Sequence, residues 1–203
     1  MNLLRSLSLS TLTAVTLAGC ANPPAAPRVP DSPGADALFQ QFVKCDDAVF
    51  RHITQNAEAL KTYGEIEAHS SGGNWFATKS PDNGPSSRTA VFKTPMTING
   101  LTVTGVLLSH FPSYGKDDRP DDYWGFYLSN DPRTVLTAMR ARYRVFMLDF
   151  PGVGIMPVDL RYVTESPDKY YSVGLSAETT NDIPGARTLL TCSIQRKFGS
   201  LKK

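Results

Sequence analysis

The sequence has almost no excess of charge of either sign. Its 203 residues include 21 basic and 19 acidic side chains, which gives a formal net charge of +2 at pH 7. A protein that binds nucleic acid generally needs a basic stripe, and the balanced charges argue against one. With 41% hydrophobic and 20% charged residues, the composition is that of an ordinary globular protein. We therefore expect a folded domain with no nucleic-acid partner.

The motifs that mark common catalytic and cofactor sites are also missing. The sequence contains no G-x-S-x-G turn, no phosphate-binding P-loop, no H-E-x-x-H zinc motif and no C-x-x-C pair. Its three histidines, His52, His69 and His110, are far apart, and none has metal-ligand spacing to another. One could meet an acid across the fold, such as His110 with Asp149, but histidines are more often ordinary surface or core residues. We expect no catalytic residue, no metal site and no cofactor.

Long apolar runs are absent beyond the first twenty residues, which read MNLLRSLSLSTLTAVTLAGC. A single basic residue, Arg5, precedes an uncharged and mostly apolar run from Leu7 to Leu17, which is too short for a transmembrane helix. This layout is typical of a secretory signal peptide. Its last four residues, Leu17-Ala18-Gly19-Cys20, resemble the lipobox of bacterial lipoproteins at every position.

This resemblance implies a location for the protein. In bacterial lipoproteins the lipobox cysteine is acylated and becomes the first residue of the mature chain, so residues 1–19 would be a signal peptide. The protein would be attached to the membrane by the lipid on Cys20, an anchor that includes palmitate. An aspartate after the cysteine favours the inner membrane, whereas Ala21 follows here. We expect a protein anchored in the outer membrane on its periplasmic side, with the proline-rich residues 20–34 as a tether.

The sequence contains only three cysteines, and their positions indicate different roles. If Cys20 carries lipid, Cys45 and Cys192 are an even number in an oxidising compartment. We expect a disulfide between Cys45 and Cys192; the alternative is two buried free thiols.

Apolar periodicity predicts helices at two places. Apolar residues recur at steps of three and four from Leu38 to Ile53, which predicts one helix with Cys45 in its buried stripe. Asp36 can cap this helix at its N-terminus. Pro132, after Asn130 or Asp131, predicts a short second helix near 131–141.

Alternation with a period of two predicts strands elsewhere. The dipeptide Asn99-Gly100 between β-branched residues predicts a tight hairpin whose strands end at Ile98 and Leu101. The expected core-facing residues alternate along three strands. They are Leu101, Val103 and Leu107 in the first, Trp124, Phe126 and Leu128 in the second, and Leu190, Cys192 and Ile194 in the last.

Short turns rather than long helices connect most of the expected strands. This favours an α+β fold, in which an antiparallel sheet has the N-terminal helix packed on one face. We expect residues 35–198 to form a single periplasmic domain and residues 199–203 a basic tail.

A polar segment between two expected strands is the best candidate for a recognition surface. It combines two tyrosines with four aspartates: Tyr114, Asp117, Asp118, Asp121, Asp122 and Tyr123. Aromatic residues are enriched where proteins meet partners. The aspartates lack the spacing of a calcium loop, and Arg119 among them opposes a cation. We interpret the segment as a weak candidate for binding a protein partner.

Together these features favour a non-enzymatic lipoprotein that binds another protein or envelope component. A sharper version is an immunity lipoprotein that inhibits a toxin delivered into the periplasm. The alternative from another class is an envelope hydrolase, which requires a histidine and a carboxylate to converge near a serine or a water.

Overall fold

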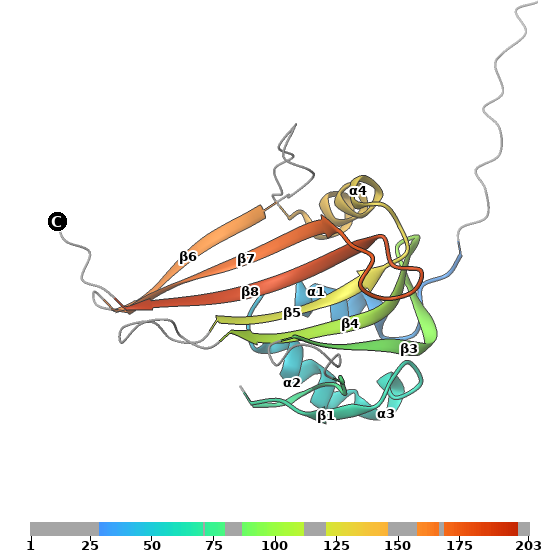
Figure 1. Cartoon of the computed structure of the whole chain (residues 1–203), viewed down its shortest axis with the longest axis horizontal. Helices are drawn as coiled ribbons and strands as arrows, with labels where there is room; N and C mark the ends of the chain where they lie inside the picture. The colour runs from blue at the N-terminus through green and yellow to red at the C-terminus, as the bar shows by residue number, and fades with distance from the viewer. Residues whose placement is uncertain are drawn as a thin grey trace, which may run out of the picture.

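The computed structural model describes the segments 29–70, 72–79, 87–111, 121–145, 158–166 and 169–198. Six strands form one antiparallel sheet in the order β3-β4-β5-β8-β7-β6 (Figure 1). These strands are β3 (Ser87–Ile98), β4 (Leu101–Phe111), β5 (Asp121–Leu128), β6 (Val158–Ser166), β7 (Lys169–Thr179) and β8 (Thr188–Phe198). A small second sheet pairs β1 (Ile66–Ala68) with β2 (Asn74–Phe76).

The prediction of an α+β fold is wrong, because the chain is mostly β. The described helices are short: α1 (Ala35–Phe42), α2 (Ala48–Gln55), α3 (Ala57–Leu60) and α4 (Pro132–Tyr143). The single helix expected from Leu38 to Ile53 is divided, because Cys45 adopts a φ of 51°, outside the helical region. Periodicity continues across this break, so apolar spacing alone did not reveal it.

Two local predictions are confirmed. Ile98 pairs with Leu101 across the β3–β4 turn, where Asn99 and Gly100 have φ angles of 48° and 76°. These positive angles are those of a type I′ turn. Asp131 caps α4, since its Oδ1 accepts a hydrogen bond of 3.0 Å from the Thr134 backbone amide.

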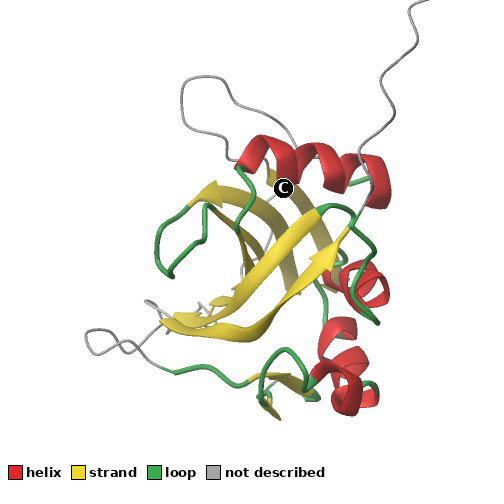
Figure 2. Cartoon of the chain, turned by 90° about the vertical axis from the view of Figure 1, so that its right-hand side faces the viewer, coloured by secondary structure: helices red, strands yellow, loops and turns green. Residues whose placement is uncertain are grey.

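The helices pack on one face of the six-stranded sheet. Phe126 on β5 lies between two aromatic rings of α1, with ring centroids 4.9 Å from Phe39 and 4.8 Å from Phe42. Figure 2 shows the sheet curling with the helices gathered on one side. The buried residues of α4, Val135, Leu136 and Met139, belong to the same core. The helices therefore cover one face of the sheet and not the opposite face.

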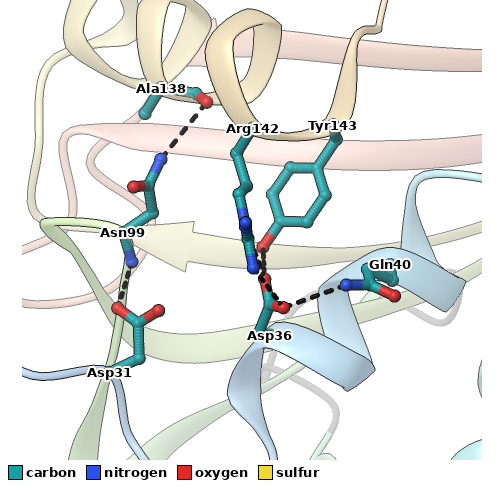
Figure 3. A network of polar contacts seen from close by, with 7 residues as sticks. All are labelled: Asp31, Asp36, Gln40, Asn99, Ala138, Arg142 and Tyr143. Atoms are coloured by element: carbon teal, nitrogen blue, oxygen red, sulfur yellow. Dashed lines mark hydrogen bonds and ion pairs between the residues drawn. The ribbon is translucent and has the colours of Figure 1, made fainter.

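A polar network fixes the start of the domain (Figure 3). Asp36 in the first turn of α1 accepts hydrogen bonds from Arg142 Nε (3.0 Å), Arg142 Nη2 (2.6 Å), Tyr143 Oη (3.2 Å) and Gln40 Nε2 (2.9 Å). The Arg142 contacts hold the pKa of Asp36 below its ordinary value, against an opposing effect of burial. Asp36 therefore joins α1 to the end of α4 and does not cap its own helix, whose N-cap is Gly34.

The residues just before α1 are also attached to the sheet. Ser32 N donates to Thr97 O at 2.8 Å, and Thr97 N donates back to Ser32 Oγ at 2.8 Å. Asp31 Oδ1 accepts a hydrogen bond from the Asn99 amide, beside the β3–β4 turn. Asp31 and Ser32, which belong to the expected tether 20–34, are thus bonded to the sheet.

The predicted disulfide between Cys45 and Cys192 is present. It joins residues 147 positions apart, with 5.1 Å between their Cα atoms, and both side chains are fully buried. Cys192 lies on the core face of β8, so the bridge ties the junction of α1 and α2 to a strand in the middle of the sheet.

We expect the double variant Cys45→Ser/Cys192→Ser to lose stability. The chain-entropy model gives about 5 kcal/mol for a loop of this length, and native disulfides typically contribute about 2–5 kcal/mol. Urea unfolding of the oxidised parent and the variant measures the difference. The parent unfolded in a reducing agent is the matched control. Equal midpoints for the variant and the oxidised parent would contradict the clamping role.

Candidate functional site

The sheet face opposite the helices carries a groove of about 730 Å³. Five neighbouring strands and the β7–β8 connection contribute to it. The lining residues are Ser87, Thr89, Leu107, Ser109, Tyr123, Tyr127, Ser176, Glu178, Asp182, Leu189 and Thr191. This volume lies within the range of about 300–1,000 Å³ that is usual for ligand sites. We call this feature the groove.

Alternation along the strands explains which side chains reach the groove. On β5, Trp124 and Phe126 are buried in the helix-covered core, so Tyr123 and Tyr127 face the other way. On β8, Leu190 and Cys192 face the core, whereas Leu189 and Thr191 line the groove. The two faces of the same strands therefore have different chemistry.

Small side chains cover the sheet at the base of the groove and leave space above it. Two hydroxyl pairs cross neighbouring strands there: Ser87 with Ser109 at 3.0 Å, and Ser176 with Thr191 at 2.7 Å. Gly125 lies between the tyrosines of β5, and a Cβ added there would be 2.6 Å from Leu190 O. Each pair shares one hydrogen bond, in which one hydroxyl donates and the other accepts, so the base of the groove is polar.

The β7–β8 connection, residues 180–187, closes one end of the groove. Ile183 and Ala186 in this connection pack with Leu107, Tyr127 and Leu189 in a second, smaller apolar cluster. The same segment positions Asp182, whose Oδ2 accepts a hydrogen bond of 3.2 Å from the Tyr127 hydroxyl. The apolar contacts of the connection thus hold a carboxylate at the edge of the groove.

Two acidic side chains, Glu178 and Asp182, line the groove. Glu178 is half-buried, and burial raises its pKa, with a smaller contribution from the charge of Asp182. Burial also raises the pKa of Tyr127, followed by the effect of Asp182. No described residue that lines the groove is basic. The two carboxylates therefore lack a counter-charge within the groove.

The structure divides the residues expected to form a recognition surface. Tyr123 lines the groove, whereas Asp122 points to the other side of β5 and contacts His110 at 2.7 Å. Asp121 begins β5, and only its backbone is described. Tyr114, Asp117 and Asp118 lie outside the described residues, as does Cys20.

The histidines show one pairing that bears on catalysis. The expected acid for His110, Asp149, lies outside the described residues, and Asp122 is its observed partner. His69 stacks on Phe50 with ring centroids 3.9 Å apart, and burial lowers its pKa despite the nearby Asp122 and Asp47. Burial also lowers the pKa of His52. Within the described segments no group of three histidine, cysteine or acidic side chains could hold a metal ion.

A second hollow, of about 500 Å³, lies between the ends of α1 and α4. Two of its three basic side chains have partners, since Arg142 binds Asp36 and Lys44 Nζ donates to Gln41 Oε1 at 2.6 Å; the third is Arg144. This hollow is part of the structural junction in Figure 3, so the groove is the better candidate for a functional site.

Sequence reasoning missed the two acids of the groove. Glu178 could have been found by extending the alternation of β7, since Leu175 and Ala177 face the core and Ser176 and Glu178 do not. Asp182 lies in an irregular connection, where no periodic signal exists.

No family model, curated protein or solved structure matches the chain. Among the described residues, no helix has the length and apolar character needed to cross a bilayer.

We expect Tyr127→Phe to loosen the closed end of the groove. The substitution removes one hydrogen bond to a carboxylate that is largely exposed, so the expected loss of stability is about 1 kcal/mol. Amide hydrogen exchange should accelerate at Ala186, whose N–H bonds to Ile183 O at 3.2 Å. The distant Lys93 amide, bonded to Tyr63 O, is the internal control. Unchanged exchange at Ala186 would show that Tyr127 does not hold the connection.

Proposed function

We propose that this protein is a non-enzymatic lipoprotein of the bacterial envelope that binds a protein partner through the groove. The observation that carries the proposal is the groove itself, whose described lining combines tyrosines, hydroxyls and two carboxylates with no basic side chain. Pockets with a few convergent polar groups are the usual binding sites of proteins.

The proposed location rests on three features of the chain. Leu17-Ala18-Gly19-Cys20 resembles a lipobox, and Ala21 favours the outer membrane, on its periplasmic side. A buried disulfide between Cys45 and Cys192 suits an oxidising compartment. Asp31 and Ser32, near the first described residues, are bonded to Asn99 and Thr97 beside the β3–β4 turn, so a tether through the residues before them would reach the domain there.

The groove extends along the β3–β4 hairpin. Ser87 and Ser109 pair at the end of the β3–β4 hairpin that is far from its turn. The opposite end of the groove lies near the turn, because the Arg187 amide of the β7–β8 connection donates to Leu128 O at 2.8 Å and Leu128 pairs with Val103. A tethered protein gains local concentration near membrane partners without further contacts.

Lipid attachment can be tested by substitution at the lipobox. We expect Cys20→Ser to abolish metabolic labelling with radioactive palmitate and to release the protein from the membrane fraction. Cys45→Ser is the matched control and should keep the label. Ala21→Asp should move the anchored protein from the outer to the inner membrane on a sucrose gradient. Palmitate labelling that survives Cys20→Ser would refute the anchor.

Partner binding can be tested in intact cells. A photo-crosslinking amino acid in place of Tyr123, at the groove, should give one defined protein adduct. The same amino acid in place of Arg51, which is exposed on α2 on the helix side, should not. An absence of adducts at Tyr123, with the protein folded and anchored, would contradict the binding function.

The identity of the adduct separates the versions of this function. A toxin encoded beside the gene of this protein would support an immunity lipoprotein. A component of envelope machinery would support a role in assembly.

The envelope hydrolase is the second candidate, and one contact favours it. His110 Nδ1 lies 2.7 Å from Asp122 Oδ1, as in the orienting half of a catalytic triad. Neighbouring Ser109 points to the opposite face of β4, into the groove, so it is not placed to complete such a site.

A further inference from the structure

We propose that the groove recognises a basic side chain, lysine or arginine, of the protein partner, which inserts between Glu178 and Asp182 beside the tyrosines. This inference rests on the proposed function and adds the chemistry of the partner.

The first argument is charge. Glu178 and Asp182 both line the groove, and burial raises the pKa of Glu178, with a smaller contribution from the charge of Asp182. No described residue that lines the groove is basic, and two basic residues of the described part already have acidic partners, Arg88 with Glu67 at 2.9 Å and Arg142 with Asp36. A cation from outside would relieve the repulsion between two carboxylates that no basic residue of the described groove lining compensates.

The second argument is the way the carboxylates are held. Tyr127 is fully buried and donates its hydroxyl to Asp182, while the apolar contacts of Ile183 keep the connection in place. Asp182 is therefore positioned before any ligand arrives, which lowers the entropy lost on binding. Asp182 is exposed, so its carboxylate is accessible to a ligand.

The third argument is the shape and lining of the groove. A volume of about 730 Å³ accommodates a side chain together with part of its backbone. Leu107 and Leu189 offer apolar surface for the methylene stem of lysine or arginine, which packs well on such surface. The ring of Tyr123 offers a face for the cationic group. An anionic ligand would meet two carboxylates, and a neutral one would leave their repulsion in place.

The experiment uses the full lipidated protein in detergent micelles and an uncharged-flank peptide, acetyl-Gly-Gly-Arg-Gly-Gly-amide. Saturation-transfer NMR detects such weak ligands and gives their dissociation constants by titration. The same peptide with citrulline in place of arginine is the isosteric neutral control. We expect binding of the arginine peptide and at least about tenfold weaker binding of the citrulline peptide, as for the loss of one charge-assisted contact.

Variants locate the effect in the groove. Glu178→Gln and Asp182→Asn should each weaken binding of the arginine peptide at least about tenfold. Glu58→Gln changes the net charge equally at an exposed position of α3 and should leave binding unchanged. Thermal unfolding checks each variant, and Asp182→Asn, in an exposed connection, provides the test if Glu178→Gln does not fold. Equal losses for Glu58→Gln and Glu178→Gln would overturn the proposal.

Combining these variants with crosslinking at Tyr123 distinguishes failure of this inference from failure of the proposed function. Loss of the adduct in Glu178→Gln supports the inference. An adduct that persists in both Glu178→Gln and Asp182→Asn overturns the inference and keeps the binding function. Tighter binding of free spermidine than of the arginine peptide would overturn the assignment to a protein side chain.

Discussion

The two-residue period of the central strands is the constraint on which the rest of the structure depends. β5 and β8 lie inside the sheet, and the side chains of each strand point alternately to its two faces, which have different surroundings. One face of these strands carries Trp124, Phe126, Leu190 and Cys192, which pack under the helices. The other face carries the tyrosines and hydroxyls of the groove. A shift of one residue in register would exchange these faces, so the core and the groove are specified together.

Several elements of the fold could be predicted because their signals are local. Asn99-Gly100 requires positive φ angles, and Asp131-Pro132 combines a cap with a fixed first turn. The disulfide followed from a count of cysteines and their places on expected core faces. These features depend on a few neighbouring residues, which a sequence displays directly.

The errors in the fold prediction arose where tertiary structure overrides the local pattern. The predicted α+β class gave too much weight to one helix, which Cys45 divides, and too little to strands. On β4 a register irregularity between Val103 and Gly105 moves Leu107 to the groove face, away from Leu101 and Val103. Of the expected recognition residues, Tyr123 alone is described in the groove, because adjacent residues of a strand face opposite sides. Of the two acids of the groove, Glu178 lies on a strand and Asp182 in an irregular connection, and no spacing rule links these two positions.

The position of β8 has a consequence for the order of folding. This last described strand of the chain, Thr188–Phe198, lies between β5 and β7. Until it is synthesised, β3-β4-β5 and β6-β7 can form only separate ribbons, each with an open edge where β8 belongs. Joining them requires contacts between residues distant in sequence, which is slow. The nascent chain therefore cannot complete the sheet before β8 has been synthesised. Until then, at most the two separate ribbons can form.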